Sequence, residues 1–423
     1  MKKIFWLLTV AITIVLTGCG GSKGNGNEKL QLWIAPNQTQ EEFWNEVVKE
    51  WNQSGNGLQV EVKTIPAAGS SEEAIMNAVA SDTAPDISTN IFSGFGAQLF
   101  DLGVVKNLNE FDQYNELIAT RKMENIMKAW TINGETPVLP VYSNPVLLWW
   151  RGDILEELGF EGVPKTYDDI YKLSEMYAKP NKRYAVKVLA GKNWWDRWFD
   201  YISYYYAASN GGAYIVNGKA IFNNETGKEV AKYIEKMHTK GWSSANFGTS
   251  NIFFEGTVLG EVKGPWDLAY GRTQYPEIMK TVKIGPMLVP SGIKTEKPYT
   301  LADSKGLVIF KSSKHPKEAW EFVKWVFEKD ELSKLWLEKT GMPPARGDLT
   351  TNSIFAEFYK KDKKAAEYAK YVDVAMPPAM QENTIDIQQA MTSEMIEPIV
   401  LKTKTVSEAV DSAVKAINNI IEK

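Results

Sequence analysis

Tryptophan is the residue type in this chain whose chemistry most directly suggests a function, with fifteen copies in 423 residues. A flat indole can cover the apolar C–H face of a sugar ring, while asparagine and glutamine match its hydroxyl rim because both donate and accept. Five tryptophans recur at apolar spacing on helical patterns and are expected in the core: Trp44, Trp51, Trp320, Trp325 and Trp336. Others are candidates to contact a ligand: Trp266 in "GPW" and the cluster Trp194, Trp195 and Trp198.

No pattern in the sequence predicts catalysis, a cofactor or a metal centre. The sequence has no HExxH, no GxSxG and no phosphate loop. A glycoside hydrolase needs two carboxylates about 5 to 10 Å apart, and no motif singles out such a pair among 52 acidic residues. One cysteine can form neither an intramolecular disulfide nor a metal cage. We therefore expect a protein that is not an enzyme and has no cofactor.

The single cysteine, Cys19, lies between an apolar stretch and a glycine-rich segment in "VLTGCGGSKGNGN". Lys2 and Lys3 precede apolar residues 4–16, which is the layout of a secretory signal peptide and too short to span a bilayer comfortably. The residues just before Cys19 resemble the lipobox of bacterial lipoproteins, in which the cysteine is diacylated. We expect a signal peptide at 1–18, a lipidated flexible tether at 19–28, and a location on the extracellular face of the cytoplasmic membrane.

Composition and charge exclude other classes of protein. The formal net charge is −4, and loss of Lys2 and Lys3 makes it more acidic, so nothing indicates a nucleic-acid partner. No later run of 18 or more apolar residues predicts a membrane span. A chain of about 400 residues exceeds one ordinary core, which predicts two domains.

The elements expected to position these residues alternate between strands and helices. A strand at 29–35 is followed by the helical pattern "EEFWNEVVKEWNQS", a stop at Gly55 and the strand "LQVEVKTI". Longer helical patterns continue to "VSEAVDSAVKAINNIIEK" at the end of the chain, without a fixed-period repeat. The predicted class is α/β, with a parallel sheet covered by helices.

Several segments resemble, in matching order, the extracellular solute-binding proteins of ATP-binding-cassette (ABC) sugar transporters, the family that includes the maltose-binding protein. They cover most of 29–350 and include "LQLWIA", "VASDTAPDI", "LPVYSNPVLLWWRGDILEELGFEGVPKTYDDI", "EGTVLGEVKGPWDLA", "LADSKGLVIFKSSKHPKEAWEFVKWV" and "TGMPPARGD". The resemblance implies a two-lobed, periplasmic-binding-protein-like fold with a hinge and an interlobe ligand cleft. It places the N-terminal lobe at 29–142 plus 303–345 and the C-terminal lobe at 143–302 plus 346–423.

The resemblance also suggests ligand-binding residues, of which Trp266 is the strongest, because its counterpart in the family stacks on a sugar ring. In the tryptophan cluster at least one ring is expected to line the cleft, since one helix face cannot hide every ring. Trp195 is the first choice and Trp194 a further candidate, and Trp198 is expected to pack in the core. The other candidates follow strands or lie at the crossovers: Asn37, Gln38, Asn90, Phe92, Tyr142, Asn144, Asp303, Ser304 and Arg346.

Alternatives remain for these residues. Trp266 would otherwise be a core residue, the amides would be solvated loop residues, and Arg346 would form an ion pair that stabilises the hinge. Asn144 stands where a well-known family member carries a carboxylate, so the sugar preference of that member does not transfer.

The function implied is reversible binding of an extracellular oligosaccharide and its delivery to a membrane ABC permease by a monomeric protein. Several aromatic platforms favour a ligand of two or more units, with β-linked xylo-oligosaccharides first, manno- or cello-oligosaccharides next, and α-linked malto-oligosaccharides after them. The alternatives are a binding protein for a peptide, polyamine or iron, a receptor that presents its ligand to a membrane sensor, and a lipoprotein glycoside hydrolase.

Overall fold

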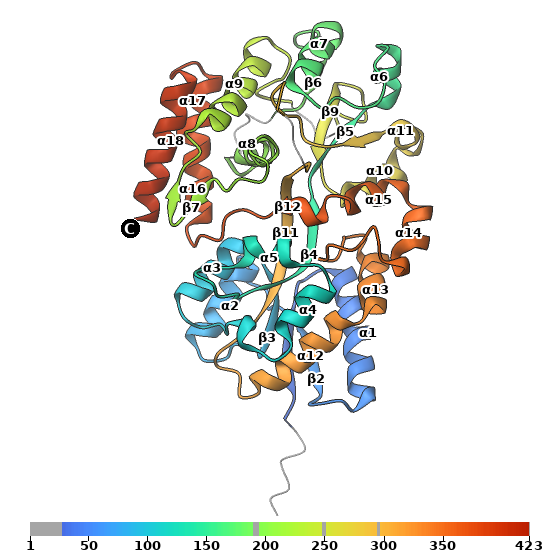
Figure 1. The fold of residues 1–423 in the computed structure, drawn as a ribbon, viewed down its shortest axis with the longest axis vertical. Helices are drawn as coiled ribbons and strands as arrows, with labels where there is room; N and C mark the ends of the chain where they lie inside the picture. The colour runs from blue at the N-terminus through green and yellow to red at the C-terminus, as the bar shows by residue number, and fades with distance from the viewer. Residues whose placement is uncertain (1–27, 189–193, 248–250, 294–296, 423) are drawn as a thin grey trace, which may run out of the picture.

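The computed structural model describes residues 28–188, 194–247, 251–293 and 297–422, with side chains omitted at 194–198. Figure 1 shows two α/β lobes, one above the other, joined by extended strands. The expected two-lobed α/β fold is thereby confirmed. Cys19, the signal peptide and most of the tether lie outside the described residues. No helix in the described ranges is long and apolar enough to cross a bilayer.

The lower lobe is built on one mixed sheet with the strand order β12-β11-β3-β1-β2, in which β4 also pairs with β11. β1 runs parallel to β2 and β3, whereas β11 is antiparallel to β3 and β4. The strands are β1 (Leu30–Ile34), β2 (Val60–Thr64), β3 (Ile87–Ile91), β4 (Leu139–Pro145), β11 (Thr300–Ile309) and β12 (Ala375–Met376). The helices are α1 (Gln38–Ser54), α2 (Ser71–Ala80), α3 (Ser93–Asp101), α4 (Tyr114–Thr120), α5 (Glu124–Met127), α12 (Pro316–Glu328) and α13 (Asp330–Thr340).

The upper lobe has a sheet with the order β10-β5-β9-β6 and a small ribbon of β7 and β8. Its strands are β5 (Leu147–Trp150), β6 (Tyr184–Val186), β7 (Ile215–Val216), β8 (Lys219–Ala220), β9 (Val258–Lys263) and β10 (Lys283–Gly285). Its helices are α6 (Gly152–Glu157), α7 (Tyr167–Tyr177), α8 (Trp194–Ala208), α9 (Glu225–Thr239), α10 (Asp267–Gln274), α11 (Pro276–Thr281), α16 (Thr384–Met391), α17 (Glu397–Val400) and α18 (Val406–Ile421). Helices α14 (Ala356–Lys361) and α15 (Lys363–Ala369) lie beside the junction of the lobes in Figure 1.

Helix α1 shows why the local sequence folds as predicted. Asn37 caps its first turn by accepting a hydrogen bond from the Gln40 backbone N–H, and Gly55 ends it in the left-handed conformation at φ 67°. Its apolar positions are buried against the sheet, including Trp44 and Trp51. The core prediction is also confirmed for Trp320 and Trp336, while Trp325 is half-buried and packs edge-on against Trp51.

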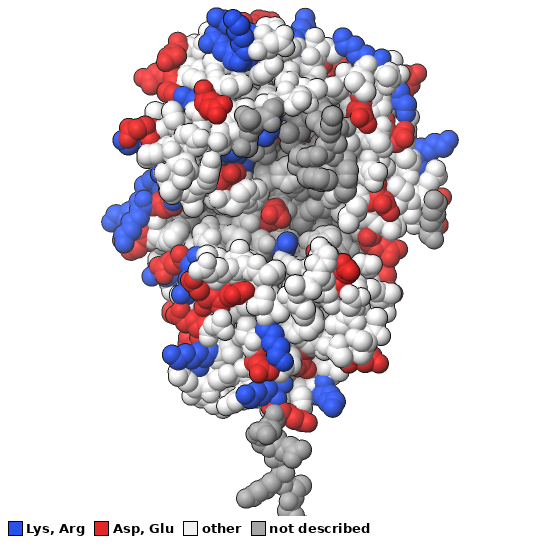
Figure 2. Space-filling model, turned by 180° about the vertical axis from the view of Figure 1, so that it is seen from behind, with Lys and Arg blue, Asp and Glu red and all other residues white. Residues whose placement is uncertain are grey.

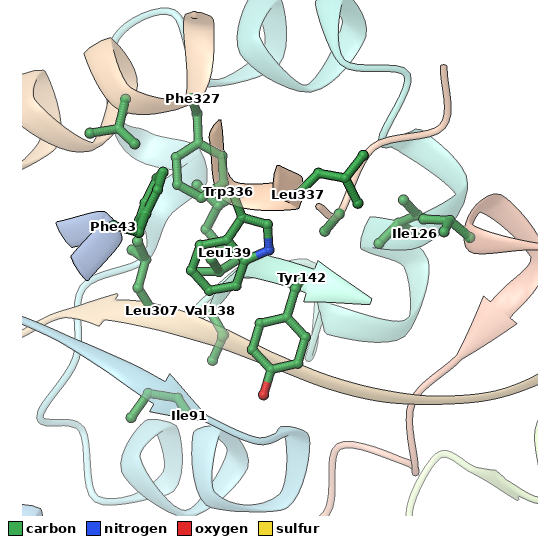
Figure 3. Close-up of a cluster of buried hydrophobic side chains, with 14 of the residues drawn as sticks. Phe43, Ile91, Ile126, Val138, Leu139, Tyr142, Leu307, Phe327, Trp336 and Leu337 are labelled. Atoms are coloured by element: carbon green, nitrogen blue, oxygen red, sulfur yellow. The ribbon is translucent and has the colours of Figure 1, made fainter. Parts of the chain in front are cut away.

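A core cluster supports the strands that leave the lower lobe. Figure 3 shows Trp336 of α13 packed between Phe43 of α1 and Tyr142 of β4, with the tyrosine hydroxyl at the far end of its ring. The ring centroids of Tyr142 and Trp336 are 5.7 Å apart and nearly parallel at 17°. The position of β4 therefore depends on packing between residues far apart in the chain.

The chain passes from the lower sheet into the upper one between β4 and β5, and β11 returns along β4. The register of β11 on β4 places Asp303 opposite Asn144 and Ser304 opposite Ser143. The Thr300 hydroxyl donates to the Val146 carbonyl at 2.6 Å, which continues the pairing beyond the end of β4. The junction of the lobes is thus a hydrogen-bonded pair of strands.

Candidate functional site

The face seen in Figure 2, which is the back of Figure 1, is hollowed between the two lobes. Acidic and basic side chains both show at the floor of this hollow. The junction strands β4 and β11 carry four of the predicted ligand residues, namely Tyr142, Asn144, Asp303 and Ser304. The structure therefore brings these four predicted residues together.

Asp303 is exposed, although its neighbours Ala302 and Ser304 on β11 are buried. Protein nevertheless surrounds its carboxyl group on most sides, and this desolvation raises its pKa, while the charge of Lys305 partly offsets the rise. Burial also raises the pKa of the Tyr142 hydroxyl, and the charge of Asp303 adds to that rise. At neutral pH Tyr142 thus keeps its proton and can act as a hydrogen-bond donor.

Asn144 is almost completely buried, and its side-chain oxygen has no hydrogen-bond partner among the described residues. An unpaired buried carbonyl of this kind costs about 1 to 3 kcal/mol, which a hydrogen bond from an incoming hydroxyl would recover. Asn144 therefore has the chemistry of a ligand acceptor.

Asn90, near the end of β3, connects β3 to the neighbouring strand β11 through its side chain. It adopts the left-handed conformation at φ 67°, and its side-chain N–H donates to the Ser71 hydroxyl at 3.0 Å. Lys305 of β11 donates to the Asn90 side-chain oxygen at 2.8 Å. Lys305 is not among the residues predicted from the sequence. The available signal was its spacing from Asp303, since residues i and i+2 of a strand lie on the same face.

Phe92 lies half-buried at the start of α3 and stacks on Phe95 with ring centroids 6.2 Å apart. In the same turn, a Cβ on Gly94 would come within 2.2 Å of the hydroxyl oxygen of Thr384, at the start of α16. The first turn of α3 is therefore in close contact with the upper lobe. Glycine is required there by the close approach, and not by its backbone angles.

Trp266 follows β9 and precedes α10, which lies at the lower edge of the upper lobe in Figure 1. Its side chain is 46% exposed, so the core-packing alternative is wrong. A Cβ on Gly264 would lie 2.1 Å from the indole, which shows that the ring rests directly on the glycine backbone. One side of the indole is thus covered and the rest is open to solvent, as a stacking platform requires.

A cluster of charges lies beside Trp266 on β9. Glu261 is buried and pairs with Lys187 at 2.7 Å and with Lys263 at 3.5 Å. Lys263 also approaches Asp267 at 3.7 Å, and burial raises the pKa of Asp267 while Lys263 offsets that rise. This cluster was not predicted from the sequence, because Lys187 and Glu261 are distant in the chain and only the pairing of β6 with β9 brings them together.

Two further predicted residues, Asn37 and Gln38, lie exposed at the end of β1. The Asn37 side-chain oxygen accepts from the Gln40 backbone N–H at 3.2 Å and from the Thr39 hydroxyl at 2.9 Å. Gln38 donates to Glu42 at 3.2 Å. The local role of Asn37 is helix capping, and ligand contact by this pair stays a prediction.

Arg346 and Ser304 have structural partners. Arg346 is 1% exposed and forms ion pairs with Asp348 at 2.5 Å and Asp330 at 2.7 Å. Its guanidinium is enclosed and paired with two carboxylates. The prediction that Arg346 contacts the ligand is therefore wrong, and the alternative of an ion pair is correct. The hydroxyl of Ser304 is buried 3.1 Å from that of Ser143, so this pair fastens β11 to β4.

The predicted ligand residues Trp194 and Trp195, and Trp198, fall outside the described side chains, although the backbone of 194–198 belongs to α8. Elsewhere in the described part of the chain, no group of side chains could hold a metal ion.

A second cavity, of about 300 Å³, is walled by residues of both lobes: 128–129, 131–133, 213–215, 217–218, 376–381 and Tyr206. It has two tyrosines, but the Tyr206 hydroxyl donates to the Pro377 carbonyl at 2.9 Å, and that of Tyr214 accepts from the Ala379 N–H at 3.1 Å. None of the predicted ligand residues with described side chains lines it. These two hydrogen bonds tie the tyrosines to the segment 377–379.

Known proteins resemble this chain over most of its length. A family model described as bacterial extracellular solute-binding protein matches residues 46–367. The arabinooligosaccharide-binding protein of Bacillus subtilis (strain 168) is 22% identical over 385 residues, which cover 84% of each chain. A solved structure of an uncharacterized protein from Listeria monocytogenes EGD-e has a TM-score of 0.87 and 32% identity, covering 93% of this chain and 99% of that one. The cyclic alpha-maltosyl-1,6-maltose binding protein of Arthrobacter globiformis has a TM-score of 0.80 and 19% identity, with the same coverage.

Proposed function

The chain belongs to the bacterial extracellular solute-binding proteins, and we propose that it binds an oligosaccharide between its lobes and delivers it to a membrane ABC permease. The family consists of binding proteins and not of enzymes. The proposal of a sugar ligand rests on the exposure of Trp266. Its large aromatic ring is open to solvent and follows the strand that carries the buried charges of Glu261 and Lys263. Exposed apolar surface rimmed by polar groups is typical of ligand-binding grooves, and a flat exposed indole suits the C–H face of a sugar.

The proposed site combines a stacking platform with hydrogen-bonding groups. Trp266 would cover the C–H face of one sugar ring, and Asn144, Asp303 and Lys305 on the junction strands β4 and β11 would bind hydroxyl groups. Carboxylate, amide and ammonium groups together supply both acceptors and donors, which suits a neutral polyol. Closure of the lobes would then remove the sugar from water.

The relatives support a sugar ligand without choosing among linkages. The Bacillus subtilis relative is named for arabino-oligosaccharides and the Arthrobacter globiformis structure for a cyclic maltosyl-maltose. Our favoured ligand remains a β-linked xylo-oligosaccharide. The second candidate, a non-sugar solute such as a peptide, polyamine or iron, has less support because the described residues contain no metal-ligating cluster and the proposed floor carries both signs of charge.

The wider arrangement is also a proposal. We propose that Cys19 carries a diacyl anchor on the extracellular face of the cytoplasmic membrane, with residues up to 28 as a tether, and that the protein acts as a monomer. The lobe boundaries near Tyr142, Asp303 and Arg346 stay predictions.

A thermal-shift screen of the purified protein against mono- and oligosaccharides tests the proposal. A ligand that binds only the folded state increases the free energy of unfolding by RT ln(1 + [L]/Kd) and so raises the melting temperature. We expect a rise with β-linked oligosaccharides, larger for xylo-oligosaccharides than for malto-oligosaccharides. Peptides and polyamines are screened in parallel. A shift with these and with no neutral sugar would replace the sugar proposal by the second candidate.

A further inference from the structure

Two exposed aromatic residues, Trp266 and Tyr270, lie four residues apart at the start of α10 on the upper lobe. Among the residues that the structure describes, the exposed large hydrophobic side chains are Leu102, Met176, Val216, Ile221, Trp266, Tyr270, Ile293, Ile385 and Leu401. Only Trp266 and Tyr270 in this set are aromatic, and each is 46% exposed. Isolated exposed aliphatic residues are normal on a protein surface, whereas two neighbouring exposed rings indicate a surface that something covers.

Helical geometry places the two rings on one side of α10. Trp266 is the N-cap residue of this helix and already has helical angles, φ −61° and ψ −25°. Residues four apart lie on the same face, and four residues advance the helix by about 6 Å. Tyr270 therefore lies on the same side of α10 as Trp266, one helical turn further along the helix.

Contacts with neighbouring groups hold the Tyr270 ring in place. Its hydroxyl donates to the Asn251 side-chain oxygen at 3.1 Å. Its ring packs edge-on against Phe254 at 6.1 Å and against Tyr275 at 6.1 Å, and these two rings stack on each other at 4.3 Å. A ring held before the ligand arrives loses little side-chain entropy on binding, which favours affinity.

The contacts of Tyr270 with Phe254 and Tyr275 leave part of its ring uncovered. Phe254 and Tyr275 already cover one another with an interplanar angle of 3°, and Phe254 is buried. Tyr270 touches their edges and keeps nearly half of its own surface in water. The open part of Tyr270 thus remains available to a ligand.

We propose that Tyr270 is an outer stacking position for a neutral oligosaccharide, adjacent to Trp266, and that it makes affinity increase with ligand length. This inference rests on the proposed function. Successive rings of an oligosaccharide are joined through one glycosidic oxygen, so a ligand seated on Trp266 extends to a neighbouring platform only if it has further units. A monosaccharide on Trp266 would leave Tyr270 uncovered.

The test measures dissociation constants by calorimetry for a ladder of one to four units of the best sugar, on the native protein and on Tyr270→Ala and Tyr270→Phe. In the native protein we expect affinity to rise with length. In Tyr270→Ala the gain from the added units should shrink roughly three- to tenfold, the range typical of aromatic stacking. Tyr270→Phe keeps the ring and should keep most of the gain.

Leu401→Ala is the matched control, because Leu401 is 64% exposed on the same lobe and belongs to no proposed site. Unfolding curves of each variant show whether it folds as the native protein does. An unchanged length dependence in Tyr270→Ala would overturn the inference while leaving sugar binding intact. An equal loss at every length in both Tyr270 variants would also overturn it, since that result indicates a role in holding α10. Absence of binding to any neutral sugar by the native protein would instead refute the proposed function.

Discussion

Replacing Trp266 by alanine tests the proposed site at the residue that carries it. The indole is 46% exposed, and a tryptophan offers about 250 Å² for burial, so roughly 115 Å² remains for a ligand to cover. At about 25 cal/mol per Å², covering this surface is worth up to about 3 kcal/mol. Trp266→Ala should therefore weaken binding of the best sugar roughly a hundredfold.

Isothermal titration calorimetry on native and variant proteins measures this loss directly. Trp266→Phe provides the matched control, since a smaller flat ring should retain part of the affinity. Far-UV circular dichroism and the melting temperature without ligand establish that both variants fold. An unchanged dissociation constant in Trp266→Ala would remove Trp266 from the site and refute the reasoning from its exposure.

Gly264→Ala examines the same platform without removing the ring. The new methyl group would lie 2.1 Å from the present position of the indole, so the ring must move away from its seat. Affinity should fall in the same direction as in Trp266→Ala. Native affinity in Gly264→Ala would show that the seated orientation of the ring is not the one that binds the ligand.

Three further predictions concern the anchor, the floor and the enclosed ion pair. Cys19→Ser should move the protein from the membrane fraction into the medium or leave it unprocessed, and unchanged fractionation would contradict the lipid anchor. The folded protein raises the pKa of Asp303, so its contribution to stability is present at low pH and is lost as the pH rises through the folded-state pKa. Asp303→Asn should therefore raise the melting temperature of the free protein at pH 7 and weaken sugar binding, and a lower melting temperature would contradict the sign. Arg346→Ala leaves two carboxylates without their partner and should cost about 3 to 5 kcal/mol of unfolding free energy in denaturant titrations, with the sugar dissociation constant unaltered wherever the protein is folded. A loss of affinity without a loss of stability would return Arg346 to the ligand site.

Local sequence was sufficient to predict several elements and the α/β class, but the predicted parallel sheet is wrong, because β11 runs antiparallel to β3 and β4, and β5 antiparallel to β9 and β10. In α1 the cap, the stop and the apolar face are all encoded within about twenty neighbouring residues, so the helix and its buried aromatics follow from periodicity. The alternation of such units predicts an α/β fold, and the ordered segments point to the family. These properties depend on neighbours in the chain, which is why the sequence determined them.

Exposure and pairing were decided only by the tertiary structure. Trp336 and Trp266 are the same residue type, yet one is 2% exposed and the other 46%, because Trp336 packs against Phe43 and Tyr142 while Trp266 rests on the backbone of Gly264 with nearly half of its surface open. Arg346 and Asp303 both lie at predicted crossovers, but the arginine is buried and paired with Asp330 of α13 and with Asp348, whereas Asp303 keeps an exposed surface although its carboxyl group is desolvated. Lys187 meets Glu261 only because β6 pairs with β9. Burial and ion pairing depend on which distant segments come together, and the local pattern of a sequence does not contain that information.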